Sequence, residues 1–208
     1  MSAITHVAAF DVDGTLTTHD CVVPFYRRVA GTGSMAARML RNPFSLAGAG
    51  VRRDRDALKA ASAAAAFRGA RVDDVQRLGQ VFAEEVYATR MRSEVVVSLD
   101  EHRRNGDTVL LVSASFEMYL RPLAALLGAD DVLGARLEIG PDGHLTGRLL
   151  GANSRGPEKV RRLHEWLDEH AGGRSAVHVT AYGDSAGDRE LLADADVAHW
   201  VGARGIPR

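Results

Sequence analysis

Two aspartates separated by one residue follow a short apolar segment near the start of the chain. The apolar segment is 7–10, and Asp11 and Asp13 come directly after it, before Gly14 and Thr15. A short, bounded apolar run is typical of a buried parallel strand, and reactive loops in open α/β sheets lie at the carboxyl ends of strands. One carboxylate there can attack phosphorus while the other manages the proton of the leaving oxygen. Gly14 and Thr15 would form a tight turn whose N–H groups hold an anion, although Asp-Gly also occurs in ordinary turns.

Two further places along the chain could bind phosphate. Ser113 and Ala114 follow the apolar run 108–112 and precede an expected helix, where a hydroxyl and free N–H groups can hold phosphate oxygens. The alternative is that the serine only caps that helix. Lys159 lies at the start of another expected helix, where the helix dipole disfavours a cation unless an anion is close. A solvated surface lysine is the alternative for this position.

An acidic segment near the end of the chain could bind a metal ion. Asp184 and Asp188 lie among glycines directly after the expected strand 176–181. Carboxylate oxygens suit Mg2+, which prefers oxygen ligands and keeps several waters. The alternative is an acidic turn in which Asp188 caps the next helix. Three of the four sites follow expected strands, so we expect them at one rim of a sheet.

The elements that would carry these sites alternate between strands and helices. Such alternation predicts a Rossmann-like, three-layer α/β/α core with a mainly parallel sheet. We expect strands at 7–10, 108–112, 176–181 and 197–201, a β-hairpin formed by 132–139 and 144–150, and helices at 95–104, 116–127, 157–170 and 189–193.

Between the first two strands the pattern is helical. Residues 20–97 are rich in Ala, Arg, Leu and Met, with apolar positions at helical spacing. We expect helices after residue 20, at 55–67 and at 73–91, with breaks at 31–33 and at Asn42-Pro43. The expected division is a core of residues 1–17 and 96–208 and an inserted all-helical domain of residues 18–95, hinged near 17–20 and 92–97. One apolar face of the first helix would consist of Val22, Val23, Phe25, Tyr26 and Val29.

Composition excludes several classes of protein. The chain has 208 residues, 46% of them hydrophobic, which is enough for a packed core. The net charge of −1 favours neither nucleic acid nor an anionic membrane, and no apolar run is long enough to span a bilayer. The N-terminus lacks the pattern of a signal peptide, so we expect a cytoplasmic protein without membrane insertion. The single cysteine, Cys21, is expected to be a small buried hydrophobe. The eight histidines show no zinc-ligand spacing, and Trp166 and Trp200 are expected in the core.

The four sites together resemble the four motifs of the haloacid dehalogenase superfamily. The helical insertion resembles the C1 cap class, and the similarity is greatest to the phosphoserine-phosphatase-like subfamily IB. The similarity extends over nearly the whole chain, from Val7 to Val201. The segments that carry it are Asp11–Thr15, Leu111–Ser115, Leu145–Arg148, Gly156–Val160 and 183–188.

The resemblance implies a role for each motif residue and implies Mg2+ as cofactor. Asp11 would be the nucleophile that forms an aspartyl-phosphate and also a metal ligand. Asp13 would be the general acid/base, with its backbone carbonyl on the metal. Lys159 would balance charge between nucleophile and phosphate, Asp184 would bind the metal, and Asp188 would order the metal waters or a neighbouring loop.

The phosphoryl oxygens would be held by Ser113, by Lys159, by Ala114 and by the N–H groups of Gly14 and Thr15. The resemblance thus predicts a phosphatase acting on a small phosphomonoester, similar to phosphoserine or histidinol phosphate. A phosphotransferase with the same aspartyl-phosphate is the alternative. A receiver or binding module that keeps Asp11 phosphorylated is a third possibility, which the acid at position 13 and the inserted helices disfavour.

Substrate choice is less clear from the sequence. Asp20 stands where phosphoserine phosphatases carry an acidic residue that meets the substrate amine, and capping of a helix is its alternative role. Gly187 and Ser185 replace a usual Asn and a usual Gly of the fourth motif, which weakens the case for strict phosphoserine specificity. Candidates for binding a substrate carboxylate are Arg52, Arg53, Arg55, Lys59 and Arg68. Oligomeric state is not readable from the sequence.

Overall fold

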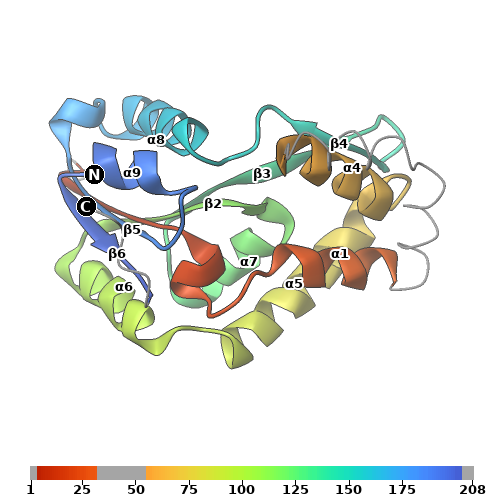
Figure 1. The fold of residues 1–208 in the computed structure, drawn as a ribbon, viewed down its shortest axis with the longest axis horizontal. Helices are drawn as coiled ribbons and strands as arrows, with labels where there is room; N and C mark the ends of the chain where they lie inside the picture. Colours follow the sequence, from red (N-terminus) through yellow and green to blue (C-terminus); the bar gives the residue numbers. More distant parts are fainter. Residues whose placement is uncertain (1–3, 32–54, 203–208) are drawn as a thin grey trace.

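A six-stranded sheet forms the centre of the molecule (Figure 1). The computed structural model describes residues 4–31 and 55–202. The strand order is β4-β3-β2-β1-β5-β6, and every neighbouring pair is parallel except β3 and β4. The expected mainly parallel sheet with one hairpin is therefore confirmed. The strands are β1 His6–Phe10, β2 Thr108–Phe116, β3 Asp131–Ile139, β4 Leu145–Leu150, β5 His178–Gly183 and β6 Val197–Trp200.

Strand β1 lies in the middle of the sheet and is buried on both faces. Alternate side chains of a strand point to opposite faces, so its apolar residues feed two separate cores. Val7 and Ala9 belong to one cluster of buried residues, and Ala8 and Phe10 belong to the other. This two-sided burial explains why the segment is an unbroken apolar run instead of an alternating one.

Helices cover both faces of the sheet, which confirms the three-layer core. On one face, α8 (Pro157–His170) and α9 (Arg189–Asp194) contribute Leu163 and Leu191 to the cluster that contains Val7. On the other face, α6 (Ser93–Asn105) and α7 (Glu117–Leu127) contribute Leu99 and Leu120 to the cluster that contains Phe10. In Figure 1, α8 and α9 lie above the sheet and α6 lies below it.

Further helices are inserted between β1 and β2, as the sequence predicted. They are α1 (Val22–Ala30), α4 (Arg55–Phe67) and α5 (Val72–Thr89). An aromatic cluster joins them to α7: the ring centroids of Phe25 and Tyr119 lie 4.8 Å apart, and those of Phe82 and Tyr119 lie 5.2 Å apart. The expectation for α1 was partly wrong, because Phe25 and Tyr26 are buried whereas Val23 is 47% exposed.

The chain enters and leaves this helical segment at adjacent points. Thr17 and Met91 form an isolated antiparallel bridge, Thr18 N–H donates to the Arg90 carbonyl at 2.9 Å, and Arg92 N–H donates to the Leu16 carbonyl at 2.8 Å. The expected hinges near 17–20 and 92–97 thus lie side by side. Their motion, and the division into a core and an 18–95 domain, stay predictions.

Some boundaries differ from the expected ones for local reasons. Strand β2 was expected to end at residue 112 but extends to Phe116, so Ser113 and Ser115 are its last polar residues instead of a loop. Strand β5 begins at His178 instead of residue 176, because Arg174–Ala176 forms a short 3-10 turn. Within the described residues, no helix is both long and apolar enough to cross a membrane.

Candidate active site

The turn after β1 brings the first motif against the acidic motif that follows β5. Residues Val12–Leu16 form a single wide helical turn, in which Gly14 has φ +89°. A side chain at Gly14 would place its Cβ 2.3 Å from Asp184 Oδ2. Glycine is therefore needed here for two reasons, its positive φ and the close approach of the Asp184 carboxylate.

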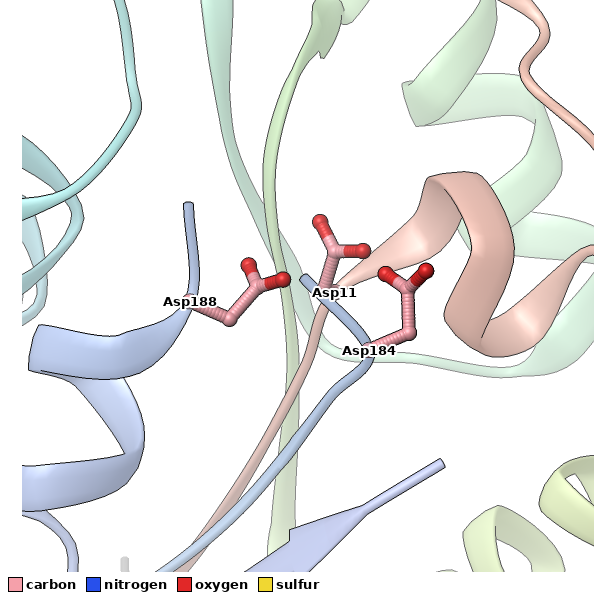
Figure 2. A group of neighbouring side chains, drawn as sticks. All are labelled: Asp11, Asp184 and Asp188. Carbon is pink, nitrogen blue, oxygen red and sulfur yellow. The ribbon is translucent and has the colours of Figure 1, made fainter. Parts of the chain in front are cut away.

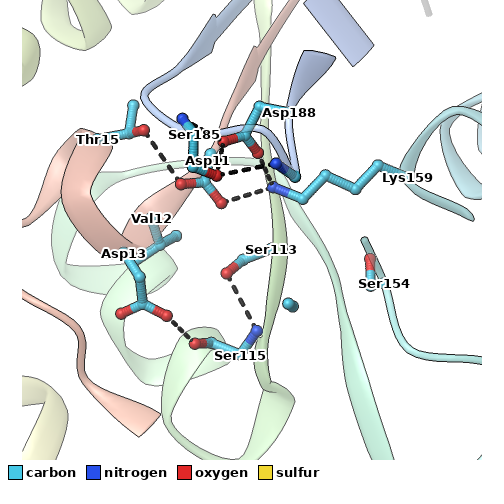
Figure 3. A network of polar contacts seen from close by, with 12 residues as sticks. Asp11, Val12, Asp13, Thr15, Ser113, Ser115, Ser154, Lys159, Ser185 and Asp188 are labelled. Carbon is cyan, nitrogen blue, oxygen red and sulfur yellow. Dashed lines mark hydrogen bonds and ion pairs between the residues drawn. The ribbon is translucent and has the colours of Figure 1, made fainter. Parts of the chain in front are cut away.

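Asp11 and Lys159 form a buried ion pair. Lys159 Nζ lies 2.6 Å from Asp11 Oδ1 and 2.6 Å from Asp188 Oδ1, and the residue is only 2% exposed (Figure 3). The expected alternative of a surface lysine is wrong. Burial lowers the pKa of Lys159, but the two carboxylates outweigh this effect and raise it, so the ammonium stays charged.

Opposing electrostatic effects act on the pKa of Asp11. Burial raises the pKa of Asp11 to about 7, the ammonium of Lys159 opposes this rise, and the carboxylate of Asp188 adds to it. Thr15 Oγ1 donates to Asp11 Oδ2 at 3.0 Å. Hydrogen-bond donors thus hold the Asp11 carboxyl in place. With a pKa of about 7, both its protonated and its ionised form are populated near neutral pH, and a further cation would favour the ionised form.

Asp13 is held by two donors at the base of the helical segment. Its Oδ1 accepts a hydrogen bond from Cys21 N–H at 2.8 Å, and its Oδ2 accepts one from the Ser115 hydroxyl. Burial raises the pKa of Asp13 to about 6; the hydrogen bond from Ser115 opposes the rise and the charge of Asp20 adds to it. A carboxyl with such a pKa can both give and take a proton near neutral pH.

Three carboxylates converge at the carboxyl ends of β1 and β5. Ligand oxygens of Asp11, Asp184 and Asp188 lie within 4.8 Å of one another (Figure 2). Thr15 Oγ1 lies between Asp11 Oδ2 and Asp184 Oδ1, at 3.0 and 3.3 Å. The group contains no histidine or cysteine, and its hard oxygen atoms fit Mg2+ better than zinc.

The three acids of this group are not equivalent. One oxygen of Asp188 accepts from Lys159, and the other accepts from Ser185 N–H at 3.0 Å and the Ser185 hydroxyl at 2.8 Å. Asp188 occupies the N-cap position of α9, but its side chain does not cap the helix. Burial and the charge of Asp188 raise the pKa of Asp184, which has Thr15 as its hydrogen-bonding partner. Asp11 and Asp184 therefore have the most freedom to bind a cation, with Asp188 supporting them.

Of the other expected phosphate-binding residues, Gly14, Ser113 and Ala114 line the same cavity, whose volume is about 780 Å3, whereas Thr15 does not line it. Ser113 is buried, and its hydroxyl accepts a hydrogen bond from Ser115 N–H at 3.1 Å. Neither serine caps α7, whose N-cap residue is Phe116. The cavity is lined by residues of all four motifs, among them Asp11, Asp13, Gly14, Ser113, Ala114, Lys159, Asp184 and Asp188.

The structure places two of the candidates for substrate recognition, Asp20 and Lys59, in or near the cavity. Asp20 lines the cavity, and its Oδ1 also accepts from Val22 N–H at 3.0 Å and Val23 N–H at 3.2 Å, so it caps α1 as the alternative role required. Lys59 Nζ donates to the Ala114 carbonyl and lies 5.2 Å from the ring centroid of Phe116.

The other basic candidates make no described contact with the cavity. Arg68 is exposed and does not line it. Arg52 and Arg53 lie outside the described residues, as do the expected breaks at 32–33 and Asn42-Pro43, and the side chain of Arg55 is not described.

Sequence reasoning missed two residues that shape the site. Arg92 donates to the Thr15 carbonyl at 3.3 Å and to the Gly14 carbonyl at 3.2 Å, so it braces the catalytic turn from the linker before α6. Arg155 lines the cavity four residues before Lys159. No spacing rule would have found Arg92, because its partners are backbone carbonyls far away in the sequence. Both tryptophans expected in the core pack in or against one apolar cluster. Trp166 is buried and donates to Asp131 Oδ2, and Trp200 is partly buried and also lines the cavity.

Comparisons with known proteins agree with this geometry. The model of the haloacid dehalogenase-like hydrolases matches residues 8–193. The chain belongs to this family. It is 35% identical over 201 residues to protein CicA of Caulobacter vibrioides, covering 97% of this chain and 88% of that protein.

Two other similarities concern phosphatases. A histidinol-phosphatase of Neisseria meningitidis is 34% identical over 95 residues, which are 45% of this chain and 43% of that one. A solved structure described as a phospho-aspartyl intermediate analogue of phosphoserine phosphatase has a TM-score of 0.58 at 20% identity, covering 92% of this chain and 84% of that one. At this identity the structural similarity concerns the fold, which is the one expected for a haloacid dehalogenase-like hydrolase.

Proposed function

We propose that this hydrolase is a Mg2+-dependent phosphatase that hydrolyses a small phosphomonoester through a phosphorylated Asp11. The observation that carries the proposal is that two neighbouring carboxyls, those of Asp11 and Asp13, have different surroundings. Asp11 lies 2.6 Å from Lys159 Nζ and next to a second acid, Asp184, where cations favour its carboxylate form. Asp13 instead accepts hydrogen bonds from Cys21 N–H and Ser115, and burial raises its pKa to about 6. The similarity to a histidinol-phosphatase and to a phosphoserine phosphatase structure supports the same chemistry.

In the first step, a carboxylate oxygen of Asp11 attacks phosphorus and the bond to the leaving oxygen breaks. Asp13 in its protonated form gives its proton to that oxygen, so the product leaves as an alcohol. Lys159 and the Ser113 hydroxyl stabilise negative charge on the phosphoryl oxygens, assisted by N–H groups of the turn after β1. The raised pKa of Asp13 makes its protonated form available near neutral pH.

In the second step, a water molecule attacks phosphorus in the acyl-phosphate. Asp13, now a carboxylate, takes a proton from the water, and the bond between phosphorus and Asp11 breaks. Inorganic phosphate leaves, and Asp11 and Asp13 are back in their starting protonation states. The hydrogen bonds from Cys21 N–H and Ser115 hold Asp13 at a fixed place between the turn and the helical segment.

The residues present fit the expected Mg2+. Asp11 and Asp184 would be its side-chain ligands, with the Asp13 carbonyl as a further oxygen and Asp188 as a neighbour that Lys159 already neutralises. When bound, the cation neutralises charge on the nucleophile and on the phosphoryl oxygens. Burial, with a smaller contribution from the charge of Asp188, raises the pKa values of Asp11 and Asp184, and a bound cation would favour the charged form of both.

A phosphotransferase with the same first step is the second candidate. It would differ only in the second step, where an acceptor hydroxyl replaces water. The residues of the site serve both reactions, so the products distinguish them. Release of inorganic phosphate without any added acceptor favours hydrolysis.

The test is phosphate release from a panel of phosphomonoesters with Mg2+, comparing the native protein with Asp11→Asn. We expect turnover that stops on addition of EDTA and in Asp11→Asn. Arg104→Gln, an exposed arginine on α6 outside the cavity, is the matched control and should keep native activity. Phosphate release that survives in Asp11→Asn would overturn the assignment of the nucleophile.

A further inference from the structure

Arg155 lies in the candidate site and has no acidic partner among the described residues. It follows the buried Ser154 and lines the cavity together with Asp11 and Asp184. Within residues 4–31 and 55–202, no ion pair or side-chain hydrogen bond of Arg155 is found. An unpaired guanidinium inside a cavity rich in carboxylates needs a reason.

The neighbouring loop is shaped to accommodate this arginine. Gly156 N–H donates to the Gly187 carbonyl at 2.8 Å, which ties the two loops together. A Cβ at Gly187 would lie 2.8 Å from Arg155 Nε and 3.1 Å from Arg155 Cγ. The φ angle of Gly187 is not among the positive ones, so its backbone conformation does not require glycine. Glycine at position 187 therefore leaves room for the Arg155 side chain, which a larger residue would displace.

Two other cations near the nucleophile already have partners, whereas Arg189, which also lines the cavity, is exposed at the start of α9. Lys159 is paired with Asp11 and Asp188, and the guanidinium of Arg92 is bound to backbone carbonyls of the catalytic turn. Lys159 can therefore neutralise a phosphoryl group on Asp11 without help from Arg155. Arginine presents a planar fork of donors that matches a carboxylate or phosphate group in a bidentate manner.

We infer that Arg155 binds a second anionic group of the substrate, so that the site prefers phosphomonoesters whose alcohol part carries a carboxylate or a further phosphate group. This inference rests on the proposed function for the phosphoryl site itself. It goes beyond it by stating the charge of the leaving group. A phosphomonoester with a neutral alcohol part would leave the guanidinium unpaired and would bind more weakly.

The test measures binding of matched phosphonates by calorimetry, so it does not depend on turnover. The probes are propylphosphonate, 3-phosphonopropionate and propane-1,3-bisphosphonate, each with Mg2+. In the second probe a carboxylate replaces the terminal methyl group of the first, and in the third a second phosphonate is attached to that terminal carbon. We expect the native protein to bind at least one of the doubly anionic probes at least ten-fold more tightly than propylphosphonate, a difference of about 1.4 kcal/mol. The comparison between the two doubly anionic probes identifies which anion the site prefers.

Variants then assign the preference to Arg155. Arg155→Gln should abolish the ten-fold preference, Arg155→Lys should keep part of it, and Gly187→Ala should reduce it by displacing the arginine side chain. Arg104→Gln should retain it in full. The inference is overturned if the native protein shows no preference, or if Arg155→Gln weakens all three probes equally, since Arg155 would then act on the phosphoryl group.

Hydrolysis of propyl phosphate by the native protein tests the proposed function separately. A protein that shows the binding preference but releases no phosphate would retain the inference about Arg155 and lose the proposed phosphatase activity. A protein that hydrolyses propyl phosphate without any preference would retain the activity and lose the inference.

Discussion

Replacing Lys159 with methionine removes the cation that lies between two buried carboxylates. Its Nζ is 2.6 Å from an oxygen of Asp11 and 2.6 Å from an oxygen of Asp188, and those two residues are 5% and 1% exposed. Methionine has a similar length, so the change leaves the packing nearly intact and the charges unpaired. We expect loss of activity together with a large loss of stability.

The size of the stability loss follows from the burial. Breaking a buried ion pair by removing one partner costs about 3–5 kcal/mol, because the remaining charge is left unpaired in a poorly polarisable environment. For a protein of this length, 1 kcal/mol corresponds to about 2–4 °C in Tm, so the expected decrease is roughly 6–20 °C. The decrease should be measured in EDTA, so that no cation replaces the lost ammonium.

The loss should also depend on pH. Burial raises the pKa of Asp11 to about 7 even with Lys159 beside it, and removal of the ammonium raises it further. A carboxyl whose pKa is higher in the folded state binds more protons there, so its unfavourable effect is greatest above pH 7 and decreases as the pH falls toward the unfolded value near 4. We therefore expect a larger difference between Lys159→Met and the native protein at pH 8 than at pH 5.

A double-mutant cycle completes the test. Asp188→Asn removes one of the two unpaired charges, so Lys159→Met combined with Asp188→Asn should be more stable than Lys159→Met alone. Arg104→Met, at an exposed position on α6, controls for the loss of a positive charge. Stability changes that are simply additive, or a Lys159→Met protein as stable as the native one at pH 8, would refute the reasoning.

Three other predictions concern separate parts of the structure. Gly14→Ala should raise the Mg2+ concentration needed for half-maximal activity by ten-fold or more, because its Cβ would lie 2.3 Å from Asp184 Oδ2; an unchanged Mg2+ titration would count against Asp184 as a ligand. Asp13→Asn should lower kcat by at least 100-fold, since the amide cannot exchange a proton. A change in KM with kcat unchanged would contradict the role of Asp13 as general acid/base. Asp131→Asn should destabilise the protein by about 1 kcal/mol at pH 7, because its carboxylate accepts from Trp166 Nε1 at 2.9 Å. Although burial alone would raise the pKa of Asp131, hydrogen bonds lower it, so this difference should persist above pH 4 and vanish as the pH falls below it; tryptophan fluorescence during urea unfolding measures it.

Much of the core could be predicted from the sequence because its signals are local. The helix at 157–170 begins with Pro157 at a position where the missing N–H costs nothing, and the structure has the same bounds. The hairpin of β3 and β4 has a glycine turn between two apolar runs, which is also a local signal. Three of the four motifs follow expected strands, and they could be placed together because the ends of strands in a parallel sheet meet at one edge.

Other features depend on contacts between distant parts of the chain. The last residues of β2 look like a loop in the sequence because Ser113 and Ser115 are polar, but the structure pairs Phe116 with Ala135 of β3. Val23 belongs to the apolar pattern of its helix yet faces solvent, because the packing angle of α1 decides which face is covered. The two roles of Asp20 could not be separated from sequence, because the residue caps α1 and lines the cavity at once.

The central position of β1 has a consequence for folding. Strand β1 is synthesised before both strands with which it pairs, because Val7 pairs with Thr108 on one side and with Val179 on the other. Both pairings close very long loops, a topology that slows folding. During translation this apolar strand has no partner until β2 has been made and is paired on both edges only after β5, and in that interval it can associate with other chains. The strand that carries the nucleophile is thus also the one most in need of protection before the sheet is complete.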